Sequence, residues 1–101
     1  MAMTGKDRAA LRGEAHHLTA LVHVGHQGLT PAVFQTLDDA LRTRELVKVQ
    51  FARTLTVPAK DAAHALATAS AAEVVQVIGR TATLYRRNPE LPKGELPAWR
   101  R

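Results

Sequence analysis

The sequence predicts one α/β domain with the element order α-β-α-β-α-β-β and a four-stranded mixed sheet layered with helices. Three observations carry this prediction. The chain has 101 residues, 46% of them apolar and 23% charged, a balance typical of one soluble domain. Short β-branched segments alternate twice with helical patterns, as they do in strand–helix–strand units. Two further strand patterns flank a glycine-containing turn and predict a closing hairpin.

The first helix is expected from about Gly5 to His16. Thr4 and Asp7 have the spacing of a capping box, in which each side chain accepts a hydrogen bond from the other residue's backbone N–H. Arg8 and Arg12 lie one turn apart and predict a basic side. The apolar side is expected to consist of Ala10 or Leu11, Ala15 and Leu18.

A buried strand and a second helix should follow. Leu21 to Val24 is short and β-branched, which favours a strand over a helix fragment. Thr30 and Pro31 are an N-cap hydroxyl and a proline suited to the first helical position, so the helix is expected to start there. Asp38 and Asp39 should form its solvated side. Its core side is expected to carry Val33, Phe34, Leu37, Ala40 and Leu41.

The next segment, Leu46 to Phe51, alternates in polarity and predicts a half-exposed strand. Lys48 and Gln50 should lie on its polar face, opposite Val47, Val49 and Phe51. Pro58 has a first-turn position in an alanine-rich third helix that is expected to run through about Ala71.

The closing hairpin is expected from Val74 to Ile78 and from Ala82 to Arg86, joined at Gly79-Arg80. The domain should therefore span residues 4–87. Three prolines in residues 88–101 oppose both helix and ladder pairing, which predicts an extended or mobile tail.

Composition narrows the classes of partner and chemistry. Fourteen Lys and Arg against nine Asp and Glu give a net charge of +5, which predicts a polyanionic partner, with nucleic acid ahead of an anionic membrane. The chain has no cysteine, which excludes disulfides, thiolate nucleophiles and cysteine-based metal sites. Without a long apolar run or a signal-like N-terminus, the protein is expected in the cytoplasm and away from membranes.

The segment from Val24 to Pro31 has the pattern strand, Gly-x-x-Gly, capped helix. Gly25 and Gly28 would let a phosphate approach without a Cβ in the way, and a helix N-terminus offers free amides with about half a unit of positive charge. His26 and Gln27 at the tip can donate to phosphate or sugar oxygens. Two glycines at this spacing also fit an ordinary turn, but the context resembles the loop by which KH domains clamp a nucleic-acid backbone.

Five motifs follow one another along the chain: Leu11-Arg12-Gly13-Glu14-Ala15-His16-His17-Leu18, Val22 to Thr30, Glu45-Leu46-Val47-Lys48-Val49, Val75 to Arg80 and Leu84-Tyr85-Arg86. Their order and spacing resemble the YhbY family, the bacterial single-domain form of the CRM (chloroplast RNA splicing and ribosome maturation) domain. The resemblance covers about residues 4–87. It implies an RNA-binding module whose fold is similar to the C-terminal domain of bacterial translation initiation factor 3, associated with precursors of the large ribosomal subunit.

The resemblance implies an RNA surface made of the Gly25–Gly28 loop and nearby cations. We therefore expect a monomeric, non-enzymatic protein without cofactor that contacts ribosomal RNA during large-subunit assembly, chiefly through phosphate and sugar. The residues expected to bind RNA are Gly25, His26, Gln27, Gly28, Arg8, Arg12, Lys48 and Arg86. The wider set of candidate cations adds Lys6, Arg42, Arg44, Arg80 and Arg87.

Other readings stay open on the residues alone. The chain could be an adaptor that binds a protein in ribosome or RNA metabolism, or a small phosphate-ligand enzyme, although no nucleophile or carboxylate pair accompanies the loop. Tyr85 could stack on a base or make a cross-strand contact, and Trp99 offers a similar choice. The spacing of the five histidines does not suit a metal site.

Overall fold

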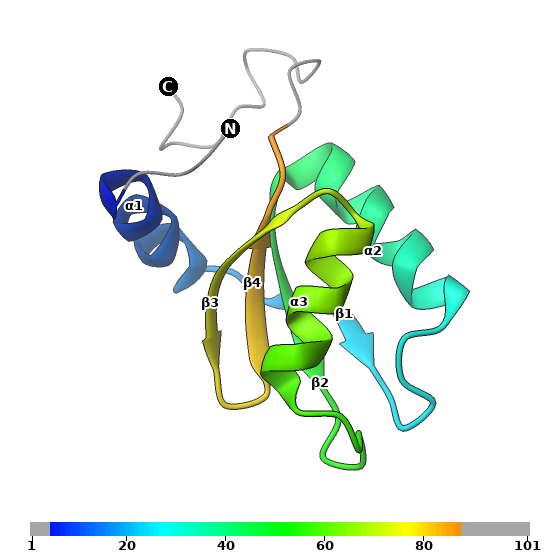
Figure 1. Ribbon diagram of the computed structural model, residues 1–101. Helices are drawn as coiled ribbons and strands as arrows, with labels where there is room; N and C mark the ends of the chain where they lie inside the picture. Colours follow the sequence, from blue (N-terminus) through cyan, green and yellow to red (C-terminus); the bar gives the residue numbers. More distant parts are fainter. Residues whose placement is uncertain (1–4, 88–101) are drawn as a thin grey trace.

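The computed structural model describes residues 5–87, so the expected capping hydroxyl of Thr4 and the expected tail at 88–101 lie outside the described residues. Within them the predicted order α-β-α-β-α-β-β is confirmed (Figure 1). The elements are α1 (Gly5–Ala15), β1 (Ala20–Val24), α2 (Pro31–Arg44), β2 (Leu46–Phe51), α3 (Ala59–Ala69), β3 (Glu73–Ile78) and β4 (Thr81–Tyr85).

The four strands form one mixed sheet in the order β1-β2-β4-β3. β1 and β2 are parallel, and the other two pairings are antiparallel. The helices α2 and α3 cover one face of the sheet, while α1 lies apart from them on the other face (Figure 1). Because α1 packs chiefly against β2 and β3, it leaves much of its face of the sheet open.

The main core lies between the sheet and the pair α2 and α3. Leu37 and Leu41 of α2 and Leu66 of α3 are fully buried against inward-facing strand residues. The alternation predicted for β2 is confirmed, since Val47, Val49 and Phe51 are buried in this core while Gln50 is exposed.

A second, smaller cluster holds α1 to the opposite face. Leu11 and Ala15 of α1 are buried there with Leu46 and Val75 of the sheet. Tyr85 packs against this cluster, so its ring makes the structural contact that was one of its two expected roles. This arrangement places α1 over the end of the sheet where β2 begins and β4 ends.

Local signals fix the ends of α2. The Val33 N–H donates to Thr30 Oγ1 at 3.3 Å, and Pro31 takes the first helical position, as predicted. The helix stops at Glu45, whose φ of 63° turns the chain directly into β2. Pro58 precedes the first residue of α3 instead of lying within its first turn. No helix within residues 5–87 is long and apolar enough to cross a membrane.

Candidate nucleic-acid interface

The Gly25–Gly28 loop is a tight β-turn at the end of β1. The Gly28 N–H donates to the Gly25 carbonyl at 3.0 Å, which closes a four-residue turn. Neither His26 nor Gln27 has a positive φ, so the turn is of type I. Both side chains are exposed at the tip. The loop therefore presents two polar side chains to solvent on a hydrogen-bonded turn.

The two glycines serve different purposes. A Cβ added at Gly25 would meet no heavy atom within 4 Å, and the φ of Gly25 lies outside the left-handed region. Gly28 has a φ of 78°, which strains any L side chain, and its Cβ would contact the Leu55 side chain at 3.8 Å. Gly28 is thus required by the turn itself. Nothing within the described fold requires glycine at position 25, where the open space would admit a ligand backbone.

The first turn of α2 uses most of its own amides. Pro31 has no N–H, and the N–H groups of Val33 and Phe34 both donate to Thr30. The sequence predicts free amides here, but the cap already uses the amide of Val33, and the first helical hydrogen bond uses that of Phe34. An anion near this loop would depend more on the exposed tip and on neighbouring cations.

Two cations come to the same end of the sheet as the glycine loop. The Ala52 N–H donates to the Val24 carbonyl at 2.8 Å, and the Phe51 N–H donates to the Arg80 carbonyl at 2.7 Å. These bonds join the ends of three strands. Arg53 and Arg80 are exposed and line one shared hollow beside Leu55, whose side chain lies next to Gly28. Figure 1 shows the three connecting loops at one end of the molecule. We call residues 25–28, 52–57 and 79–80 the strand-end edge.

The open face of the sheet adjoins this edge. The strand register places His23, Gln50, Thr81 and Ile78 side by side across all four strands. The side chains of His23 and Gln50 are exposed, and Ile78 is 62% exposed. The strand-end edge therefore continues onto a mixed polar and apolar row where a nucleic acid could lie.

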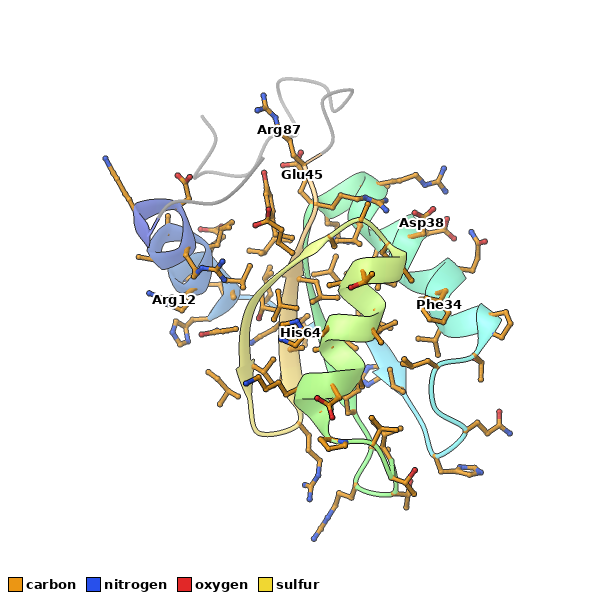
Figure 2. The ribbon with its side chains drawn as sticks, viewed as in Figure 1. Arg12, Phe34, Asp38, Glu45, His64 and Arg87 are labelled. Carbon is orange, nitrogen blue, oxygen red and sulfur yellow. The ribbon has the colours of Figure 1, made fainter. Side chains whose placement is uncertain are left out.

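The four predicted cations outside the loop do not gather around it. Arg8 donates to the Val74 and Val75 carbonyls at 2.7 and 3.2 Å, where β3 has a bulge. Lys48 Nζ donates to the Leu18 carbonyl at 3.3 Å. Arg12 is exposed on α1 (Figure 2).

Arg86 lies at the end of the sheet remote from the glycine loop. It donates to Asp38 Oδ1 at 2.8 Å and to the Ser70 carbonyl at 2.9 Å, and its side chain is only 20% exposed. Arg8, Lys48 and Arg86 thus have structural partners, and their contact with RNA stays a prediction.

Asp38 and Asp39 are only partly the solvated side that the sequence indicated. Asp38 pairs with Arg86, which it holds against the middle of α2, and also with Arg42. Hydrogen bonds from Arg42 and then Gln35 lower the pKa of Asp39 below its ordinary value. Within residues 5–87, no three His, Cys, Asp or Glu side chains come together as a metal site would require.

Arg53 is a cation of this edge that no sequence motif indicated. It lies in the loop between β2 and α3, which carries no motif of its own. A usable signal was present, because β1 and β2 were predicted to belong to strand–helix–strand units. The carboxyl ends of parallel strands meet at one edge, so residues directly after Phe51 should lie beside those directly after Val24.

Comparison with known proteins places this fold in a family. The model of the CRS1/YhbY (CRM) domain matches residues 3–86. The chain is 38% identical over 95 residues to "Probable RNA-binding protein YqeI" of Bacillus subtilis, covering 94% of this chain and 99% of that one. It is 35% identical over 95 residues to "RNA-binding protein" of Haemophilus influenzae, covering 94% and 95%. The solution structure of SAV1595 from Staphylococcus aureus matches with a TM-score of 0.77 and 34% identity, over 95% of this chain and all of that one.

Proposed function

Because the chain belongs to the CRS1/YhbY (CRM) domain family, we propose that it binds RNA without catalysis and that the strand-end edge is its contact surface. The observation that carries this proposal is the pairing of an unobstructed Gly25 with two exposed cations, Arg53 and Arg80, at one end of the sheet. The names of the similar proteins from Bacillus subtilis and Haemophilus influenzae support RNA as the ligand.

The proposed contact is made mainly to the RNA backbone. Gly25 lets a phosphate or ribose approach the turn closely, while His26 and Gln27 donate to its oxygens. Arg53 and Arg80 supply attraction that does not depend on base sequence. Any binding of this kind weakens as salt rises, because each neutralised phosphate releases counterions.

A matched pair of glycine substitutions tests the proposal. Added side chains at Gly25 and at Gly13 both face open space, so Gly25→Leu and Gly13→Leu should both fold. We expect Gly25→Leu to weaken binding of a labelled single-stranded RNA about tenfold, measured by fluorescence anisotropy. Gly13→Leu lies on α1, away from the edge, and should bind like the unmodified protein. Equal affinities for all three proteins would contradict the proposed surface.

We further propose that the RNA is ribosomal RNA in precursors of the large subunit. The support is the resemblance to single-domain CRM proteins, which implies this partner. The test is ultraviolet crosslinking of the full chain to RNA in its host, followed by sequencing. Reads should be enriched in large-subunit ribosomal RNA, and the bound fraction should sediment with particles smaller than the finished subunit. Crosslinks spread evenly over messenger and transfer RNAs would overturn this assignment while leaving RNA binding itself intact.

A further inference from the structure

A second concave site lies at the opposite end of β1 from the glycine loop. It is a cavity of about 330 Å³ between the end of α1, the start of β1, the end of α2 and the start of β2. This volume is at the lower end of the range for small-ligand pockets, so the cavity suits a group the size of a nucleoside. Its lining includes Glu14, Leu18, Leu21, Arg44 and Lys48. We call it the β1-start cavity.

The lining combines three kinds of group that recognise a nucleobase. Leu18 and Leu21 supply apolar surface, and Leu21 is 42% exposed although it is a large aliphatic residue. Glu14 supplies a carboxylate, and Arg44 and Lys48 supply cations. Within residues 5–87, no ion pair involves Glu14 or Lys48, although both line this cavity.

Resting on the proposed function, we propose that the β1-start cavity binds a guanine base of the RNA strand held at the strand-end edge. Guanine carries two adjacent donors, N1–H and N2–H₂, which match the two oxygens of a carboxylate such as that of Glu14. Its O6 and N7 are acceptors suited to a lysine or arginine. Adenine, cytosine and uracil offer only one donor group on the corresponding edge, so they satisfy the carboxylate less well.

The position of the cavity would let one RNA strand reach both the cavity and the glycine loop. β1 runs from the cavity to the glycine loop over five residues, a span of roughly 17 Å. The exposed side chains of Leu21 and His23 follow this path on the open face of the sheet. Lys48 remains able to donate to a base, because its ammonium group has three donors and its bond to the Leu18 carbonyl uses one.

The experiment compares short RNAs that differ at one position. The probes are an oligouridylate and versions with one central uridine replaced by guanosine, inosine or adenosine. We expect the guanosine version to bind about tenfold more tightly than the adenosine version. The inosine version lacks the N2 amino group and should therefore bind more weakly than the guanosine version. Equal binding of the guanosine, inosine and adenosine versions would overturn the cavity proposal but not RNA binding, whereas no binding of any probe would overturn the proposed function first.

Two charge-matched variants identify the residue responsible. Glu14→Gln and Asp61→Asn each raise the net charge by one, and Asp61, in the first turn of α3, does not line the cavity. Glu14→Gln should remove the preference for guanosine over inosine without weakening binding of the oligouridylate, and Asp61→Asn should keep the preference. A preference unchanged in Glu14→Gln would overturn the role of this carboxylate.

A titration with guanosine monophosphate tests whether the cavity binds the free nucleotide as well as it binds a guanosine within an RNA strand. Weak binding of the free nucleotide, compared with the guanosine-containing RNA, is expected because the loop adds backbone contacts. Equal affinities for both ligands would overturn the claim that one strand spans the cavity and the loop.

Discussion

Gly25 and Gly28 frame the same turn but differ in what a side chain would cost there. Gly28 has a left-handed φ of 78°, so a substituted residue would be strained whatever space surrounds it. Gly25 carries no such constraint, and its Cβ direction is open. The turn therefore needs one glycine for its own geometry and leaves the other available for a ligand.

This difference predicts that substitution of Gly28 destabilises the fold more than substitution of Gly25. Gly28→Ala should lower the free energy of unfolding by about 1–2 kcal/mol, measured by urea denaturation. Gly25→Ala should change it by less than about 0.5 kcal/mol. If both substitutions destabilised the fold equally, the assignment of separate roles would fail.

Arg86 joins elements that are distant in the sequence. Its guanidinium bonds to the Asp38 carboxylate, to the Asp38 carbonyl and to the Ser70 carbonyl. It thereby ties the end of β4 to α2 and to the end of α3. The expected role in RNA binding was inferred from charge alone, and the sequence does not reveal partners 48 and 16 residues away.

We expect Arg86→Met to lower the free energy of unfolding by about 1–3 kcal/mol, because bonds from a charged, partly buried donor are lost. The control is Arg42→Met, since the pairs of Arg42 with Asp38 and Asp39 are largely exposed. That change should cost less than about 1 kcal/mol. Thermal and urea unfolding check both values, and an Arg86→Met protein as stable as the control variant would contradict the anchoring role.

At the scale of elements, α1 depends on a small cluster of its own. Leu11 and Ala15 are its buried residues, and Arg8 adds bonds to the bulged edge strand β3. The bonds from Arg8 occupy two carbonyl groups of this edge strand, a feature that opposes pairing of the edge with another chain. The helices α2 and α3, in contrast, share the main core with all four strands.

Removing the Leu11 side chain should therefore affect α1 before the rest of the fold. Leu11→Ala should lower the free energy of unfolding by about 2–4 kcal/mol, and the rate of amide hydrogen exchange should rise first in residues 5–15. Leu21→Ala provides a comparison at an exposed position and should cost much less. Uniform exchange across the whole domain in the Leu11 variant would argue against a separately held helix.

The elements that the sequence predicted correctly are those with local causes. Thr30 and Pro31 start α2, polar alternation marks β2, and Gly79 permits the final turn with a φ of 59°. The contacts of Arg8 and Lys48 could not be predicted in the same way, because they join residues 66 and 30 positions apart. Periodicity indicates which face a side chain occupies but not which carbonyl it will reach.

At the scale of the whole molecule, the positive charges within residues 5–87 are not concentrated on one face. Arg42 and Arg44 lie at the end of α2 and Arg12 lies on α1, while Arg53 and Arg80 belong to the strand-end edge. A net charge of +5 alone would attract RNA to any of these places. The geometry of the glycine loop is what favours the strand-end edge over the others.

The salt dependence of RNA affinity distinguishes contacts made by particular cations from attraction by the net charge of the protein. Arg53→Gln and Arg80→Gln should each weaken RNA binding and reduce the slope of log affinity against log salt by about one. Arg42→Gln removes the same charge at a remote site and should leave the slope nearly unchanged. Equal effects of all three substitutions would indicate attraction by net charge without a defined surface.

The most direct measurement is an NMR titration of the labelled protein with RNA. The account predicts that amide shift changes centre on residues 25–28, 52–57 and 79–80 and extend along the open face to β1 and β2. Shift changes centred instead on the outer surfaces of α2 and α3 would contradict the claim that RNA meets this protein at the ends of its strands.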